Sequence, residues 1–195
     1  MNVVIIKYNA GNTQSVIYAL ERLGITPALS DDFDTIRSAD RVIFPGVGEA
    51  STTMEHLKAM KLDGLIPELR QPVLGICLGM QLMCRFTEEG NTRCMGIFDA
   101  KVLKFAPIHN IKVPHMGWND ISTIKGNWTS REVLDTNMYF VHSYYVPVID
   151  ETAAICDYGQ SFSAALQKDN FYATQFHPEK SAKQGQQIIK NFIEL

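Results

Sequence analysis

A cysteine between two glycines is the residue of this sequence with the clearest chemical potential. Cys77 is the centre of the run Gly75-Ile76-Cys77-Leu78-Gly79, which follows an apolar strand-like stretch and precedes a helix-like one. A sharp strand-to-helix turn presents a nucleophile above the edge of a sheet, and the glycines remove side chains that would collide across it. The following helix N-terminus favours thiolate. A small buried hydrophobe is the alternative, but the glycines favour a nucleophile.

A histidine and a glutamate later in the chain supply the partners that a thiol nucleophile needs. His177 and Glu179 flank Pro178, between a predicted strand and a predicted helix. A general base activates the thiol, and a carboxylate orients the base. An ordinary histidine at a helix start is the alternative, and the presence of Cys77 favours the catalytic interpretation. The competing histidines have no carboxylate in so tight a turn: His56, His109, His115 and His142.

A glycine-rich turn after an earlier strand predicts an oxyanion hole. Gly46, Val47 and Gly48 follow the predicted strand, and backbone N–H groups in such a turn can face a developing oxyanion, together with the N–H of Leu78. A phosphate loop is disfavoured, because Ser51 occupies the place of a third glycine and no Gly-Lys-Ser/Thr run follows. These residues predict acyl transfer through a thioester at Cys77, and they leave amidase, esterase and peptidase chemistry open.

Composition narrows the class of protein. The chain has 195 residues, a net charge of −3 and 46% hydrophobic residues, so we expect a single domain over residues 1–195 and exclude a disordered chain. No apolar stretch is long enough for a membrane span, and no secretory signal or basic nucleic-acid surface is evident. Cys77, Cys84, Cys94 and Cys156 form no CxxC pair. We therefore expect a reduced, cytoplasmic protein without a metal or cofactor.

Hydrophobic patterning in the first half predicts alternating strands and helices. The predicted strands are 3–7, 25–29, 41–44 and 73–76, and the predicted helices are 13–23, 51–60 and 78–86. In the second half the predicted strands are 96–105, 118–124, 138–141, 153–157, 163–167 and 171–175, before a closing helix over 181–195. The fold class is α/β: a mostly parallel twisted sheet with helices on both faces, and an antiparallel extension packed on the parallel core.

Three motifs, in this order, resemble the class I glutamine amidotransferases, which have a flavodoxin-like fold: PGVG at 45–48, GICLGMQ at 75–81 and FHPEKS at 176–181. Three further stretches resemble the branch of glutaminase subunits of imidazole glycerol phosphate synthase: IIKYNAGNTQSV at 5–16, PHMGWN at 114–119 and YFVHSYY at 139–145. The resemblance covers essentially the whole chain.

This resemblance implies a reaction and a partner. Glutamine would be hydrolysed to glutamate and ammonia through a glutamyl thioester at Cys77, with His177 and Glu179 completing the catalytic set. The ammonia would pass, within a heterodimer, to a TIM-barrel synthase that makes imidazole glycerol phosphate and aminoimidazole carboxamide ribotide in histidine biosynthesis. The implied oxyanion hole is Gly46, Val47, Gly48 and Leu78, and the implied glutamine contacts are Gln81, Glu89, Ser143 and Tyr144.

The resemblance also implies a docking surface around the mouth of the Cys77 site. The implied partner contacts are Asn12, Trp118, Tyr139 and Lys180. Core packing is the alternative for the two aromatic residues, and a solvated charge is the alternative for Lys180. For Glu89 the alternative is a solvated loop carboxylate beside Glu88.

One stretch departs from the family pattern, because Glu49 follows the glycine turn where the family more often has a small residue and then an aromatic one. The residues here are similar to the glutaminase of pyridoxal phosphate synthesis, an assignment that PHMGWN disfavours. Two other functions remain as alternatives: a non-catalytic regulatory subunit with a degenerate site, which the intact Cys77, His177 and Glu179 disfavour, and a thiol peptidase or chaperone of related fold.

Overall fold

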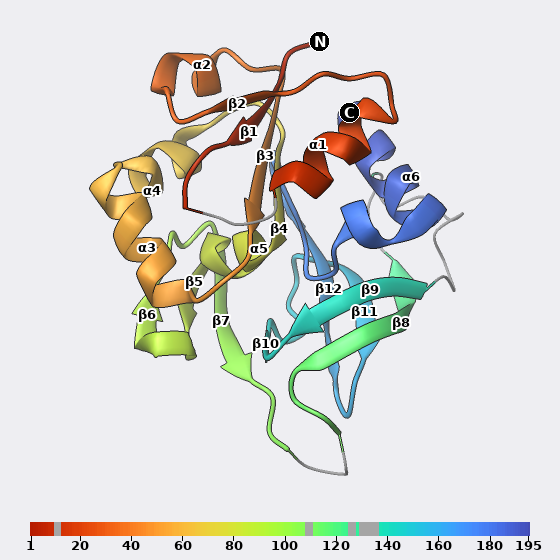
Figure 1. Ribbon diagram of the computed structural model, residues 1–195. Coiled ribbons are helices and arrows are strands. Elements are labelled where there is room, and N and C mark those ends of the chain that lie inside the picture. The colour runs from red at the N-terminus through yellow and green to blue at the C-terminus, as the bar shows by residue number, and fades with distance from the viewer. Residues whose placement is uncertain (10–12, 108–110, 125–127, 129–136) are drawn as a thin grey trace.

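The computed structural model describes residues 1–9, 13–107, 111–124, 128 and 137–195, and a twisted sheet runs through them (Figure 1). In these residues the sheet has nine strands in the order β2-β1-β3-β4-β13-β12-β11-β8-β9. The strands from β2 to β13 are parallel. They are β1 (Val3–Ile6), β2 (Ala28–Ser30), β3 (Arg41–Gly46), β4 (Val73–Cys77) and β13 (Phe171–Thr174).

The remaining strands of this sheet are antiparallel and continue it on the far side of β13. They are β8 (His115–Ile124), β9 (Asn137–His142), β11 (Thr152–Asp157) and β12 (Ser161–Lys168). The prediction of an antiparallel extension is therefore confirmed, but the extension joins the parallel strands edge to edge through hydrogen bonds instead of packing across them.

Helices cover both faces of the parallel strands, as predicted (Figure 1). The side chains of Val3 and Ile5 belong to one apolar cluster and those of Val4 and Ile6 to another, because successive residues of a strand point to opposite faces. The first cluster includes residues of α1 (Thr13–Glu21) and α6 (Ala182–Ile193), and the second includes residues of α2 (Phe33–Arg37), α3 (Ala50–Ala59), α4 (Leu62–Leu65) and α5 (Leu78–Met83).

The predicted helix over 78–86 is wrong beyond Met83. Residues Cys84–Thr87 form strand β5, in a smaller sheet of order β10-β7-β5-β6. At Cys84 the backbone becomes extended, and β5 pairs with β6 (Thr92–Arg93) and β7 (Phe98–Lys104). Strand β10 is Tyr144–Tyr145, and the turn η2 (Glu89–Asn91) follows β5. Tertiary pairing here overrides a local helical pattern, and the small sheet was not predicted.

Short helical segments were also missed in the sequence. They are α2, α4 and the turns η1 (Ile66–Glu68), η2 and η4 (Pro178–Lys180). Such short pieces carry too few residues for a helical period to register. Within the described ranges, no helix combines the length and apolarity that a membrane crossing requires.

Candidate active site

The Cys77 turn joins β4 to α5 in a strained backbone conformation. Cys77 has φ 54° and ψ −107°, a region that residues with a side chain rarely occupy. Its flanking glycines are needed for space: a Cβ on Gly79 would lie 2.2 Å from the carbonyl oxygen of Phe44, and one on Gly75 would lie 2.8 Å from the Met83 sulfur. The close approach of β3, β4 and α5 therefore holds the sulfur in one place.

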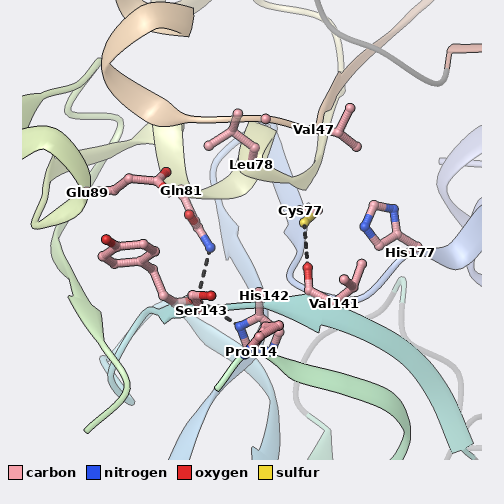
Figure 2. Close-up of a pocket in the computed structure, with 12 residues that line it drawn as sticks. Val47, Cys77, Leu78, Gln81, Glu89, Pro114, Val141, His142, Ser143 and His177 are labelled. Carbon is pink, nitrogen blue, oxygen red and sulfur yellow. Dashed lines mark hydrogen bonds between the residues drawn. The ribbon is translucent and has the colours of Figure 1, made fainter. Parts of the chain in front are cut away.

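His177 and Glu179 form a buried pair beside this cysteine. The Nδ1 atom of His177 lies 2.8 Å from Oε1 of Glu179, and each side chain is 2% exposed. Nε2 makes no hydrogen bond to any described residue, and the ring lies next to Cys77 (Figure 2). Burial acts to lower the pKa of His177, but interactions with Cys77 and Glu179 outweigh it and raise that pKa above 6.5.

Backbone hydrogen bonds fix the position of this histidine. The N–H of His177 donates to the Tyr139 carbonyl at 2.9 Å, and the Ser181 hydroxyl donates to the His177 carbonyl at 2.7 Å. The N–H of Tyr139 in turn donates to the Ser181 oxygen at 2.9 Å. The turn η4 is thus tied to strand β9 on both sides of the imidazole, which limits its movement relative to Cys77.

A cavity of about 330 Å³ opens over the sulfur. In Figure 2, Cys77 lies between His177 on one side and Gln81 and Glu89 on the other. The lining residues come from six separate stretches of chain: Val47, Gly48, Cys77, Leu78, Gln81, Glu89, Pro114, Val141, His142, Ser143, Tyr144 and His177. The volume suits a small molecule, and the lining is polar at both ends.

Of the four residues expected to form an oxyanion hole, three line the cavity and one does not. Val47, Gly48 and Leu78 line the cavity. Gly46 instead pairs with Cys77 in the sheet, and a Cβ there would lie 2.6 Å from the Gly79 nitrogen, so its role is to allow close packing. The buried Tyr8 hydroxyl donates to the Pro45 carbonyl and so anchors the start of this loop, a contact that no sequence pattern indicated.

The glutamates near the cavity have different partners. One oxygen of Glu89 accepts the N–H of Ala50 at 2.9 Å, and burial raises the pKa of Glu89. The position at which the sequence departs from the family pattern, Glu49, caps α3 by accepting the N–H groups of Ser51 and Thr52. These hydrogen bonds, Thr52 first, lower the pKa of Glu49 to about 2.

None of the expected partner contacts that the structure describes lines the Cys77 cavity itself. Trp118 is 53% exposed, which contradicts the alternative of a core aromatic, and its ring lies 5.9 Å from that of Tyr139 on the neighbouring strand. Lys180 is exposed and lines a groove with Trp118 and α6. Asn12 lies outside the described residues.

Sequence reasoning missed three polar side chains around the nucleophile. Gln175 is fully buried, and its Nε2 lies 3.8 Å from the Cys77 sulfur. His115 and His142, set aside for lack of a carboxylate, form a buried pair with Nδ1 of His115 3.0 Å from Nε2 of His142. Burial lowers the pKa of His115 to about 4 and that of His142 to about 3, so both rings are neutral. The available signal for Gln175 was a polar residue directly after the apolar strand β13 and two positions before His177.

A known protein family and two named relatives are similar in sequence to this chain over almost its whole length. The sequence model described as "Glutamine amidotransferase class-I" matches residues 4–195. The chain is 63% identical to the imidazole glycerol phosphate synthase subunit HisH of Bacteroides fragilis, with 100% of both chains covered. It is 46% identical to the same subunit of Yersinia pseudotuberculosis, again with 100% of both chains covered.

Solved structures share the fold. A structure titled "Crystal structure of glutamine amidotransferase" matches with a TM-score of 0.76 at 16% identity, covering 100% of this chain and 98% of the other. A putative GMP synthase protein from Thermoplasma acidophilum matches with a TM-score of 0.74 at 21% identity, covering 100% of this chain and 93% of that one.

Proposed function

This chain belongs to the class I glutamine amidotransferase family, and on that premise we propose that it hydrolyses glutamine through a glutamyl thioester at Cys77. One observation carries the proposal: a cysteine in a strained strand-to-helix turn shares a small cavity with a buried His177–Glu179 pair. A thiol, a base and an orienting carboxylate in contact are the set that acyl transfer requires.

In the first step, the Cys77 thiolate attacks the carboxamide carbon of glutamine. The carbonyl oxygen becomes an oxyanion, for which the N–H of Leu78 and N–H groups of the Val47–Gly48 turn are the proposed donors. Leu78 begins α5 directly after the nucleophile, so its N–H belongs to the unsatisfied first turn of that helix.

His177 then carries the proton. As imidazolium it donates Nδ1–H to Glu179 and Nε2–H to the departing nitrogen, so that the C–N bond breaks and ammonia leaves. A water molecule next attacks the thioester, His177 takes a proton from it at Nε2, and the C–S bond breaks to give glutamate and free thiolate. Glu179 supports both steps because its oxygen fixes the ring and stabilises its charge.

We assign substrate recognition to the side of the cavity opposite His177. The proposed glutamine contacts are Gln81, Glu89 and the backbone of Ser143 and Tyr144, all of which line it. Glu89 uses one oxygen on Ala50, which leaves a carboxylate oxygen for the α-ammonium group of glutamine. Gln81 donates through Nε2 to two acceptors of the protein, which leaves its Oε1 for the substrate.

We further propose that the chain is the glutaminase subunit of an imidazole glycerol phosphate synthase. Full-length identity of 63% and 46% to proteins named as its HisH subunit supports this assignment. Ammonia would pass to a TIM-barrel synthase subunit, in a cytoplasmic heterodimer, for synthesis of imidazole glycerol phosphate and aminoimidazole carboxamide ribotide. The proposed docking surface includes Trp118, Tyr139, Lys180 and Asn12, the last of which lies outside the described residues. Coupling of glutamate release to the partner would prevent wasted glutamine.

Glutamate release with and without the synthase subunit tests this function. We expect the two chains to copurify, and we expect release to rise when the synthase and its acceptor substrate are added. Cys77→Ala should abolish release while Cys94→Ala, a buried cysteine outside the cavity, should retain it. Normal release by Cys77→Ala would contradict the thioester, and failure to bind any barrel synthase would contradict the assignment to this synthase.

A further inference from the structure

We propose that Gln175 stabilises the Cys77 thiolate by donating an amide N–H to its sulfur, and that a chain of hydrogen bonds beginning at the Tyr144 carbonyl holds Gln175 in the orientation this requires. The inference rests on the proposed function, because it assigns a new residue to the same nucleophile.

The first step is the contact with sulfur itself. Nε2 of Gln175 lies 3.8 Å from the Cys77 sulfur, which is within hydrogen-bonding range of so large an atom. The sulfur is also 3.9 Å from the Val141 carbonyl oxygen, which can only accept. The carbonyl therefore favours the neutral thiol, whereas the amide N–H of Gln175 favours the thiolate. Gln175 is fully buried, so water does not compete for this contact.

The second step is the orientation of the amide groups. Gln81 donates through Nε2 to the Tyr144 carbonyl at 3.0 Å and to Oε1 of Gln175 at 2.9 Å. The Tyr144 carbonyl accepts only, so it selects the NH₂ end of Gln81. That NH₂ group in turn selects the oxygen end of Gln175, which leaves the NH₂ end of Gln175 facing the sulfur. Reversing either amide would set two donors or two acceptors against each other.

The third step is the support of the Tyr144 carbonyl. Nδ1 of His142 lies 2.7 Å from this oxygen and must donate to it, so Nε2 of the neutral ring accepts from Nδ1 of His115. The Nε2 atom of His115 then accepts from the Asn119 amide at 3.3 Å. Each ring has a single consistent tautomer. The chain of contacts therefore extends from strand β8 to the nucleophile. It fixes the Tyr144 carbonyl, which determines the orientation of the Gln81 and Gln175 amides.

Alkylation of Cys77 by iodoacetamide across a pH series tests the role of Gln175 without using glutamine. The variant is Gln175→Met, which keeps the length of the side chain and removes the donor. The matched control is Gln71→Met, because Gln71 also donates through Nε2 to a carbonyl, that of Ile36 at 2.8 Å, and neither residue lines the cavity. Peptide mass spectrometry resolves the modification of Cys77 from that of the other cysteines.

We expect Gln175→Met to raise the pH of half-maximal alkylation by about one unit or more, which is about tenfold less thiolate at a given pH. Gln71→Met should keep the parent profile. A folded Gln175→Met protein with the parent profile would overturn the proposal. If that variant does not fold, Gln175→Glu is tested in its place. Its carboxylate still accepts from Gln81 and places negative charge against the sulfur, so the pH of half-maximal alkylation must rise. An unchanged profile in this variant overturns the proposal.

This outcome is separable from that of the proposed function. Failure of the proposed function would appear as no glutamate release by the parent protein with its partner, or as normal release by Cys77→Ala, whatever the alkylation profile of the Gln175 variants. Failure of the present inference would appear as an unchanged alkylation profile in an enzyme that still depends on Cys77.

Discussion

His177 and His142 both line the cavity around Cys77, and both are almost fully buried. Their rings nevertheless contact groups of different charge. His177 faces the Glu179 carboxylate, and the pKa of its ring is raised above 6.5. His142 contacts the Tyr144 carbonyl and the neutral ring of His115, and its pKa is lowered to about 3. Burial alone would make both rings neutral, so the partner decides the charge.

The two surroundings suit two different tasks. A buried carboxylate compensates the charge of an imidazolium, which lets His177 hold and transfer a proton during the reaction. The His115–His142 pair is packed among aromatic rings, with Tyr158 3.9 Å and Phe140 4.9 Å from His115 between ring centroids. No carboxylate contacts it in the described residues, so this pair serves as a fixed hydrogen-bonding element.

The largest expected difference between the two pairs is in activity. His177→Gln removes the proton carrier and should lower the rate of glutamate release by about 10³-fold or more. His142→Asn keeps a donor for the Tyr144 carbonyl and should lower it by much less. The measurement is steady-state glutamate release with the synthase subunit present. Equal losses in the two variants would remove the functional distinction between these histidines.

Glu179→Gln should lower the rate by about 10²-fold or more, because the imidazolium loses its compensating charge. The variant should also change the pH profile. The carboxylate raises the pKa of His177, so its removal lets the ring lose its proton at a lower pH, and the alkaline limb of the activity profile moves toward neutral pH. A profile with the parent alkaline limb would show that Glu179 does not set the charge of this ring.

The His115–His142 pair should instead affect the stability of the fold at acid pH. Because the folded-state pKa values are about 4 and about 3 and the unfolded value is 6.5, the unfolded chain binds more protons below pH 6.5. The free energy of unfolding should therefore fall with decreasing pH, by up to about 1.4 kcal/mol per pH unit for each ring between pH 6.5 and 4. His177 adds nothing to this slope, since a raised pKa gives a contribution that is fully present below 6.5 and is lost only at alkaline pH.

Urea unfolding across this pH range measures the slope. The double variant His115→Asn/His142→Asn should have a shallower dependence than the parent, even where its absolute stability is lower. An identical slope in the two proteins would mean that the pair titrates normally in the folded state.

The smallest effect requires no substitution. Nitrogen NMR of the imidazole rings should show His142 with its proton on Nδ1 and His115 with its proton on Nδ1, both unchanged from pH 7 to pH 5, because these tautomers alone satisfy the contacts. His177 should show two ring protons over the same range. Titration of His142 near pH 6.5 would contradict the assignment of a fixed neutral pair.

Local spacing predicted two parts of this site, and the complementary chemistry of a thiol and an imidazole predicted that His177 would join Cys77. The strand-to-helix turn at Cys77 and the His177–Glu179 contact each lie within a few residues, so sequence distance limits the geometry. The contacts that were missed join distant residues: Gln81 and Gln175 are 94 residues apart, and the two histidines of the neutral pair are 27 apart. Their meeting depends on the order of the strands, which local patterns do not specify.

The fold follows the same division. Apolar runs predicted the parallel strands and their covering helices, since both faces of β1, β3, β4 and β13 are buried. The error at β5 arose because Cys84–Thr87 pair with β6 and β7, strands that come later in the chain. A helical period in residues 78–86 could not reveal those partners.

Trapping of the acyl-enzyme tests the central claim most directly. The parent enzyme, mixed with glutamine while bound to the synthase and quenched in acid within one turnover, should carry one glutamyl group, and peptide mass spectrometry should place it on Cys77. Glu179→Gln should retain the attachment site while the adduct forms more slowly. Turnover of glutamine with no adduct at any time, or with the glutamyl group on Cys84, Cys94 or Cys156, would contradict the account.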